Sequence, residues 1–192
     1  MKMDRKAHFF FAVSLPEEVK KELNNLCLTI KEKLPFQRWV HQEDYHITLA
    51  FLGVASEDKL KEATKLVFKQ LNGQSSFPLH INQLGVFGKK DSPRIFWADT
   101  AKEEQLTKIR ELVFSACLEA GFELETRAYK PHITLARKWT GSNPFEEYCL
   151  KQNNPFINAP LTFQAKEVVL YQTHIDRFPK YEKIAAYPLL EE

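Results

Sequence analysis

Two segments of the chain share one arrangement of apolar and polar positions, in which a short apolar run leads into a helical pattern. After the run Phe9–Leu15, apolar residues recur every three or four positions, which predicts an amphipathic helix. The same spacing follows the apolar run Ile95–Ala98. The predicted buried stripes are Val19, Leu23, Leu26 and Ile30 in the first helix, and Leu106, Ile109, Val113 and Ala116 in the second.

Residues that favour helix ends flank both stripes. Ser14 and Thr100 each precede a glutamate by three residues, which is the spacing of a capping box, and Gly121 follows the second stripe. A third helix is predicted between these two, beginning at Ser56 and ending at Asn72-Gly73. Its buried stripe consists of Leu60, Ala63, Val67 and Leu71.

Apolar runs bounded by turn residues predict strands in the rest of the chain. Besides the first apolar run, the predicted strands are Leu79–Val86, Ile95–Asp99, Phe163–Tyr171 and Tyr181–Tyr187. Turn residues cluster at Gly88–Pro93 and Thr173–Pro179. The tract Thr140–Pro160 is rich in Asn, Pro and Gly, so we expect a loop there with at most one short helix.

The pentapeptide His46–Ala50 recurs letter for letter as His132–Ala136, a shift of 86 positions. The same shift relates two further pairs of segments. They are Phe9–Ala12 with Ile95–Ala98, and Leu79–Phe87 with Ala165–Thr173. One constant shift across three segments indicates a duplicated supersecondary unit. We therefore predict one α+β domain over residues 1–192, made of two interleaved lobes.

Composition and charge narrow the class of protein. Of the 192 residues, 44% are hydrophobic, 27% charged and 12% aromatic, which excludes disordered and collagen-like chains. The formal net charge of +2 is too small for indiscriminate binding along a nucleic-acid backbone. Any contact with nucleic acid should therefore be local.

Neither the start of the chain nor its cysteines indicates export. Met1–Lys6 and the apolar run after it lack a small-residue cleavage site, so we expect a first strand rather than a secretory signal. The run is also far shorter than the roughly 20 apolar residues of a membrane-spanning helix. Cys27, Cys117 and Cys149 are too few and too widely spaced for a disulfide framework or a metal clip. We expect a cytoplasmic protein that spans no membrane.

The repeated pentapeptide carries the candidate chemistry. Side chains alternate along a strand, so His46 and Thr48 share one face, as do His132 and Thr134. If the lobes meet about a pseudo-twofold axis, two imidazoles and two hydroxyls converge on one cleft. In-line displacement at phosphorus needs an acid and a base on opposite sides, and an imidazole can be either near neutral pH. The set suits hydrolysis of a phosphodiester and requires no metal or other cofactor.

Two other interpretations of the motif are weaker. A single His-x-Thr on a strand is more often structural, but packing alone would preserve the apolar residues and gives little reason to keep His and Thr twice. Zinc binding is disfavoured because the motif lacks the ligand spacing of familiar zinc sites and contains no acidic residue. No metal site is therefore predicted.

Two such motifs about half a chain apart resemble the signature of the two-histidine (2H) phosphoesterase superfamily. Other segments are similar to its RNA 2′,3′-cyclic phosphodiesterase branch, also called the 2′-5′ RNA ligase family. In chain order they are His8–Pro16, Arg38–Val40, His46–Gly53, Gly85–Phe87, Pro93–Ala98 and Lys130–Arg137.

The resemblance implies a bilobal α+β fold with two antiparallel sheets, helices on the outside and a central cleft. It also implies metal-independent opening of a 2′,3′-cyclic phosphate on RNA to a 2′-phosphate. In the family the first motif's His is the proton donor and the second the acceptor, which here means His46 and His132. By the same carry-over, Thr48 and Thr134 bind the phosphate. From the residues alone the two histidines are equivalent.

Arg137 completes the family's second motif, but it lies five positions after His132. This odd separation turns it away from the cleft in a regular strand, unless a bulge or strand end restores it. Phosphate binding and a structural ion pair both stay open for this residue. Its repeat partner is the apolar Phe51.

Other side chains are weaker candidates. Three aromatic residues are candidates for stacking on RNA bases, although packing in the core or at its rim is the more common role of such residues. They are Trp39, Tyr129 and Trp139. A cluster of basic residues in one turn either contacts the RNA backbone or forms a solvated loop. It consists of Lys89, Lys90 and Arg94. A structural role is expected for His8, His41, His80 and His174.

The leading hypothesis is a phosphodiesterase whose partners are RNA termini or small cyclic-phosphate nucleotides, with no obligate protein partner. One alternative is joining of RNA through a 2′-5′ bond, which is the same chemistry reversed. Others are hydrolysis of a small cyclic nucleotide or ADP-ribose derivative, and a non-catalytic module that holds RNA ends. The residues leave open the product isomer, the physiological RNA and the oligomeric state.

Overall fold

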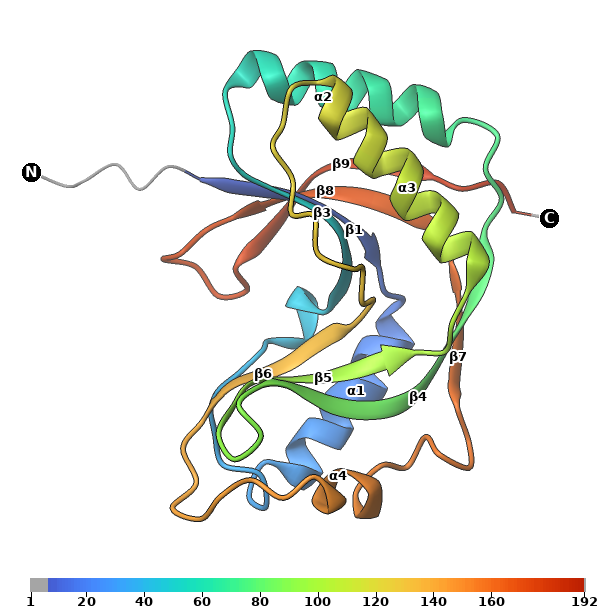
Figure 1. Cartoon of the computed structure of the whole chain (residues 1–192). Coiled ribbons are helices and arrows are strands. Elements are labelled where there is room, and N and C mark those ends of the chain that lie inside the picture. Colours follow the sequence, from blue (N-terminus) through green and yellow to red (C-terminus); the bar gives the residue numbers. More distant parts are fainter. Residues whose placement is uncertain (1–6, 192) are drawn as a thin grey trace, which may run out of the picture.

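The computed structural model describes residues 7–191, so Met1–Lys6 and the expectations placed on them lie outside it. This part of the chain forms two antiparallel sheets and four α-helices (Figure 1). The strands are β1 (His8–Ser14), β2 (Phe36–Trp39), β3 (His46–Val54), β4 (Phe77–Gly88), β5 (Pro93–Thr100), β6 (Ile133–Trp139), β7 (Leu161–Ala165), β8 (Glu167–Thr173) and β9 (Tyr181–Pro188). The helices are α1 (Glu17–Ile30), α2 (Glu57–Leu71), α3 (Glu104–Glu119) and the short α4 (Tyr148–Gln152), with a 3₁₀ turn at Gln42–Asp44. None of the helices within residues 7–191 has the length and apolar character of a membrane span.

The two sheets repeat one strand order, which confirms the predicted duplication. One sheet runs β3-β1-β8-β9, and the other runs β2-β6-β5-β4-β7, so that β6, β5, β4 and β7 correspond to β3, β1, β8 and β9. The shifts of two segment pairs differ from the predicted 86. Phe11 pairs with Ala50 and Phe96 with Ala136, so Phe11 corresponds to Phe96, a shift of 85. These two residues also pair with Leu170 and Val86, so Val86 corresponds to Leu170, a shift of 84.

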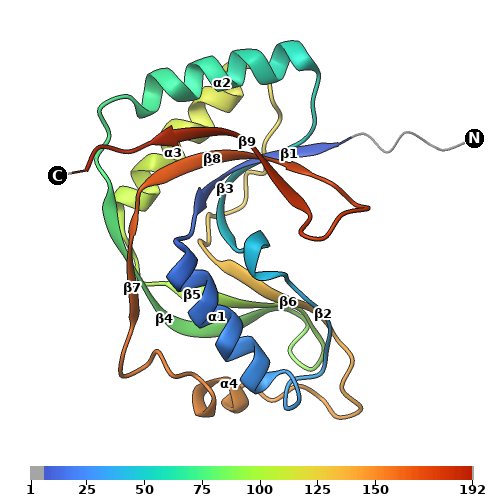
Figure 2. The same ribbon diagram turned by 180° about the vertical axis from the view of Figure 1, so that it is seen from behind.

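The helices connect the two sheets by crossing between them. Helix α1 follows β1 of the four-stranded sheet but lies over the five-stranded sheet, as both views show (Figures 1 and 2). Helix α3 follows β5 of the five-stranded sheet and packs with α2 over the four-stranded sheet, next to β3. Each of these helices therefore follows a strand of one sheet and lies over the other sheet.

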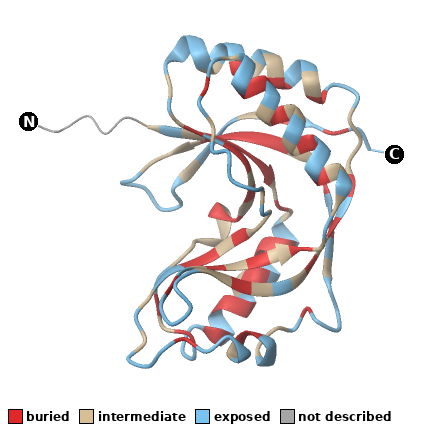
Figure 3. Cartoon of the chain, in the orientation of Figure 1, coloured by how far each residue is buried: buried red, intermediate tan, exposed pale blue. Residues whose placement is uncertain are grey.

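The predicted stripes form the core between these helices and sheets (Figure 3). All four stripe residues of α1 are buried, as are all four of α3 and three of the four of α2, where Leu60 is half-buried. Gly73 and Gly121 adopt the left-handed conformation at φ +80° and +84°, which glycine tolerates at helix ends. Ser56 caps α2 by accepting from the amide of Lys59, as predicted.

Both predicted capping boxes are wrong. The residue before α1 is Pro16, and Ser14 belongs to β1, where its hydroxyl donates to Glu167. The residue before α3 is Glu103, whose carboxylate accepts from the amide of Gln105, and Thr100 is still in β5. In both cases the strand continues to the predicted cap residue, so its side chain cannot turn back to the helix.

Two strand predictions also need correction. The run Phe163–Tyr171 is not one strand, because the chain passes at Lys166 from one sheet to the other. Residues Leu161–Ala165 pair with β4, and Glu167–Thr173 pair with β1. The short strand Phe36–Trp39 was not predicted, since four residues with a single buried member show no clear period. The loop predicted at Thr140–Pro160 holds only the short helix α4.

We expect Leu23→Ala to lower the free energy of unfolding by about 2–5 kcal/mol, because Leu23 is fully buried on α1 and truncation leaves a cavity. The matched control is Leu28→Ala on the same helix, where the side chain is 53% exposed and the change should stay within about 0.5 kcal/mol. Urea unfolding of both variants measures the difference. Equal stabilities would contradict the packing described for α1.

Candidate active site

The two repeated histidines are held in the same way at the start of β3 and β6. His46 Nδ1 lies 2.7 Å from the carbonyl oxygen of Asp44, and His132 Nδ1 lies 2.8 Å from that of Lys130. A carbonyl oxygen can only accept, so Nδ1 of each ring carries the proton and donates it. In the neutral ring Nε2 is then a free base. The backbone thus fixes one tautomer for both imidazoles.

The first motif also links its two polar side chains. Thr48 Oγ1 lies 3.1 Å from His46 Nε2, and since neutral Nε2 has no proton, the hydroxyl donates to it. Ile47 and Leu49 are buried beneath them, as are Ile133 and Leu135 in the second motif. The strand alternation predicted from the sequence is therefore present in both copies.

A β-bulge follows each motif and changes which face the next residues occupy. Between the pairs Ala12–Thr48 and Phe11–Ala50 the register slips by one, and the same slip lies between Trp97–Thr134 and Phe96–Ala136. The extra residues are Leu49 and Leu135, and in each copy the following alanine is also buried.

The bulge in β6 places Arg137 on the face of Thr134. Arg137 pairs with Ile95, and Ile95 shares a face of β5 with Trp97, the partner of Thr134. The regular-strand geometry that would turn Arg137 away therefore does not apply here. The positive charge of Arg137 contributes to lowering the pKa of both histidines.

Burial is the main electrostatic influence on the histidine pair. It lowers the pKa of His46 to about 4, with further lowering by the neighbouring His132 and Arg137, against the opposing hydrogen bond to Asp44. Burial also lowers the pKa of His132, and Arg137 adds to this effect, against the opposing hydrogen bond to the carbonyl oxygen of Lys130. Without a bound anion, both imidazoles are neutral at pH 7, and a negative group between them would raise both pKa values.

Aromatic rings cause the burial of the histidines. The ring centroids of Phe10 and Tyr181 lie 4.7 and 5.2 Å from that of His46, and Tyr171 lies at 5.9 Å. The ring of Phe87 meets that of His132 edge-on at 4.9 Å, and it is the one aromatic neighbour of His132 among residues 7–191. The environment of His46 is thus the more aromatic of the two.

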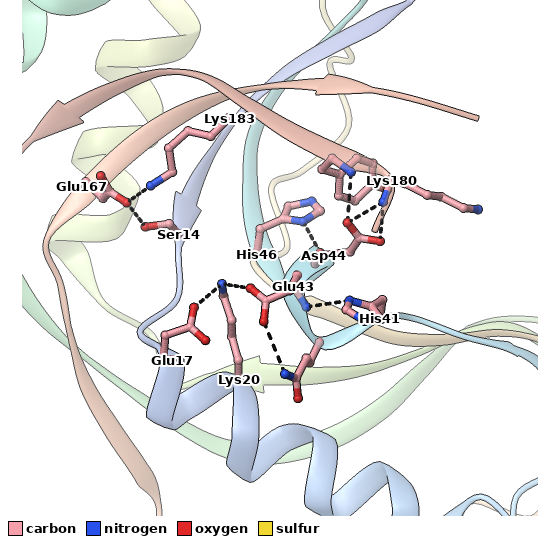
Figure 4. Close-up of polar contacts among 12 residues, drawn as sticks. Ser14, Glu17, Lys20, His41, Glu43, Asp44, His46, Glu167, Lys180 and Lys183 are labelled. Atoms are coloured by element: carbon pink, nitrogen blue, oxygen red, sulfur yellow. Dashed lines mark hydrogen bonds and ion pairs between the residues drawn. The ribbon is translucent and has the colours of Figure 1, made fainter. Parts of the chain in front are cut away.

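Asp44 anchors the hairpin between β8 and β9 beside His46, a role that the sequence analysis missed. Its buried carboxylate accepts from the amides of Lys180 and Tyr181, each at 3.0 Å (Figure 4). Its carbonyl oxygen meanwhile holds His46. The repeat partner of Asp44 is Lys130, which is exposed. No sequence signal could reveal this contact, because its partners lie 136 and 137 positions away.

The 3₁₀ turn before His46 is fixed from a second side. Glu43 accepts from Lys20 of α1 at 2.8 Å, and Lys20 also donates to Glu17 (Figure 4). Burial opposes the charge on Lys20, but these two carboxylates outweigh it and raise the pKa of Lys20. Helix α1 and strand β9 therefore both hold the turn that carries His46.

The other candidates from the sequence have structural surroundings. Trp39 packs on Phe36 and Phe96, and Trp139 packs on Phe36 and donates its indole N–H to the carbonyl of Asn143. Tyr129 has a buried hydroxyl without a partner and lies beneath the guanidinium of Arg110. Exposed positions are occupied by Lys89, Lys90 and Arg94.

The remaining histidines have local partners. His41 accepts from the amide of Glu43, His80 is bonded to Thr162, and His174 to Glu182. His8 meets Phe51 edge-on. Across residues 7–191, no three His, Cys, Asp or Glu side chains gather as a metal-binding group would. The three cysteines form no disulfide.

A family model described as "LigT like Phosphoesterase" matches the chain twice, over residues 13–97 and 99–181. The two matches begin 86 residues apart, which is the shift between the repeated motifs.

Curated relatives match nearly the whole chain. An RNA 2′,3′-cyclic phosphodiesterase of Geobacillus stearothermophilus is 41% identical over 186 residues, 97% of this chain. The chain spans only 58% of that relative's length. An RNA 2′,3′-cyclic phosphodiesterase of Bacillus subtilis is 35% identical, with 97% of this chain and 98% of the relative covered.

Solved structures show the same fold. Escherichia coli LigT complexed with 3′-AMP superposes with a TM-score of 0.75 at 22% identity, covering 95% of this chain and 97% of that one. TT0787 of Thermus thermophilus superposes with a TM-score of 0.77 at 23% identity, covering 96% and 99%. The bilobal α+β architecture predicted from the sequence is therefore confirmed.

We expect Asp44→Asn to destabilise the protein by about 1–3 kcal/mol, because the new amide group would face the N–H of Lys180 donor to donor. Amide hydrogen exchange at Lys180 and Tyr181 should become faster. The control is Asp176→Asn in the same hairpin, an exposed position where the change should stay within about 0.5 kcal/mol. Unchanged exchange in the Asp44 variant would rule out the anchor.

We expect Arg137→Gln to raise the pKa of both His46 and His132, because it removes a cation that opposes their protonation. The pKa of His46 should stay below 6.5, since burial is the largest cause of its lowering and persists. Imidazole ¹⁵N shifts, measured against pH in phosphate-free buffer, report the change. Arg127→Gln serves as control because Arg127 acts on neither ring. If Arg137→Gln leaves both pKa values unchanged, the guanidinium of the wild-type protein does not act on the histidines.

Proposed function

Because the chain belongs to the LigT-like phosphoesterase family, we propose that it hydrolyses 2′,3′-cyclic phosphate ends of RNA to 2′-phosphomonoesters. The two relatives at 41% and 35% identity carry this activity in their names. The observation that carries the proposal is the pair of imidazoles held in one tautomer, with Nδ1 of each ring bonded to the backbone and Nε2 left unprotonated. The reaction needs no metal ion.

The proposed step is an in-line displacement. His132 Nε2 takes a proton from water as the water oxygen bonds to phosphorus, and the bond from phosphorus to the ribose 3′ oxygen breaks. His46 Nε2 gives its proton to that leaving oxygen. The products are a 2′-phosphomonoester and a free 3′ hydroxyl. The assignment of donor and acceptor follows the family resemblance, since the two rings are held alike.

Thr48, Thr134 and Arg137 stabilise the charge on the phosphoryl oxygens. Protonation of His46 turns its Nε2 from an acceptor into a donor, so the Thr48 hydroxyl no longer donates to it. That hydroxyl is then free to donate to the substrate. Thr134 has the equivalent position beside His132, and Arg137 lies on the same face. Donors fixed in this way act most strongly as charge develops in the transition state.

The low pKa of His46 couples its protonation to substrate binding. At a pKa of about 4 it is uncharged at neutral pH without a ligand, and an acid must be charged. The negative charge of the cyclic phosphate offsets the influence of Arg137 and His132 and raises the pKa of His46. The proton donor is therefore formed together with the enzyme–substrate complex. A nucleotide ligand is in keeping with the 3′-AMP and NADP⁺ complexes of Escherichia coli LigT.

We expect the wild-type protein to convert a short RNA with a 2′,3′-cyclic phosphate to a 2′-phosphomonoester in the presence of EDTA. His46→Ala and His132→Ala should each lower kcat/KM by about a thousandfold, the scale of a lost acid or base. His80→Ala, outside the site, is the control. Phosphorus NMR follows the reaction and identifies the product isomer.

The same variants separate the two roles. A p-nitrophenyl phosphodiester has a leaving group that needs no proton, so His46→Ala should recover much of its activity on it, whereas His132→Ala should not. Full activity of both variants on RNA, or no conversion by the wild type, would refute the proposal. A longer RNA, formed when a 5′-hydroxyl strand is present, would indicate ligation instead.

A further inference from the structure

Two arginines face each other on neighbouring strands next to the histidine pair. Arg38 of β2 is the direct cross-strand partner of Arg137 of β6, and both are exposed. Within residues 7–191 the arginine salt bridges involve Arg127 and Arg177, so neither member of this pair has an acidic partner. Like charges directly opposite each other destabilise a strand pair. A bound anion would remove that cost.

Arg38 lies on the same face of the sheet as the candidate site. Arg38 pairs directly with Arg137, and directly paired residues share a face of the sheet. Arg137 in turn lies on the face of Thr134. The row of cations thus begins beside the histidines and extends outward.

The strand that carries Arg38 has no counterpart in the other lobe. In the described chain, β3 is the edge of its sheet, whereas its equivalent β6 has β2 outside it. The residue equivalent to Arg137 in the first copy is Phe51, which has no such cross-strand partner beyond it. The extra strand therefore extends the site on the His132 side alone and places one further guanidinium there.

We propose that Arg38 binds the phosphodiester immediately upstream of the terminal cyclic nucleotide, and so favours RNA ends over free cyclic mononucleotides. This inference rests on the proposed function. Arg137 lies on the face of β6 that carries Thr134, a proposed phosphate ligand, while Arg38 lies one strand further out. An RNA chain carries its next anion beyond the terminal nucleotide, and a cyclic mononucleotide carries none. A guanidinium is well suited to bind phosphate oxygens in pairs.

The test compares two substrates in one enzyme. The first is adenosine 2′,3′-cyclic phosphate, and the second is the dinucleotide ApA with a 2′,3′-cyclic phosphate, which adds one upstream phosphodiester. Arg38→Ala should lower the ratio of kcat/KM on the dinucleotide to that on the mononucleotide by about tenfold, mainly through KM, because the contact is made equally before and during reaction. Arg38→Lys should recover part of the ratio by restoring the charge.

A salt series provides a second measurement. The slope of log kcat/KM against log salt for the dinucleotide should become shallower by about 0.7 in Arg38→Ala, the value for one phosphate contact on a single strand. Lys65→Ala is the charge-matched control, because it removes one exposed cation from α2. That variant should keep both the substrate ratio and the salt slope of the wild type.

Each outcome decides the proposal. An unchanged ratio in Arg38→Ala overturns it, including the case in which activity falls equally on both substrates, which would place Arg38 at the reacting phosphate. A changed ratio that Lys65→Ala reproduces would show a general charge effect and would also overturn it. No hydrolysis of either substrate by the wild type would instead refute the proposed function.

Discussion

Burial of alternate residues in β3 and β6 is the constraint on which the site depends. The alternate apolar side chains are at most 3% exposed, and they are Ile47, Leu49, Ile133 and Leu135. Each strand can bury its two residues in one register only. A slip by one residue would turn these side chains to the surface and the histidines into the core. The free energy that stabilises the core thus also orients His46 and His132. The bulge that follows in β6 shifts the alternation by one residue. It thereby brings Arg137 to the same face.

The sequence predicted the parts of the fold that depend on local periodicity. The three helical stripes, the duplicated unit and the face shared by His46 and Thr48 all follow from spacing along the chain. It did not predict features decided by distant partners. The change of sheet at Lys166, the hydroxyl of Ser14 bound by Glu167, and the carboxylate of Asp44 bound to the hairpin each depend on residues far away in sequence. The bulge at Leu135 is similar, because its neighbours Thr134 and Ala136 are equally compatible with a regular strand, and the bulge is defined by pairing with β5.

The two lobes share one device and surround it differently. On the His46 side, Asp44 anchors a hairpin and aromatic rings cover the imidazole. On the His132 side, the equivalent position is the exposed Lys130, and an added strand brings a second arginine into line with Arg137. Duplication supplied two equivalent histidines, and these unequal surroundings give them different electrostatic environments. Such a difference is what an acid and a base at one phosphorus require.

The crossing of α1 and α3 between the sheets has a consequence for how the chain is made. When the first strand and helix leave the ribosome, the apolar stripe of α1 has no sheet to cover, because β4, β5 and β6 are synthesised later. The four-stranded sheet likewise waits for α3, and it lacks β8 and β9 until the end of the chain. Neither half can complete its own core. An ancestral single copy with the same crossing would have needed a second molecule to exchange helices with, so the duplicated chain carries within itself an arrangement suited to a swapped dimer.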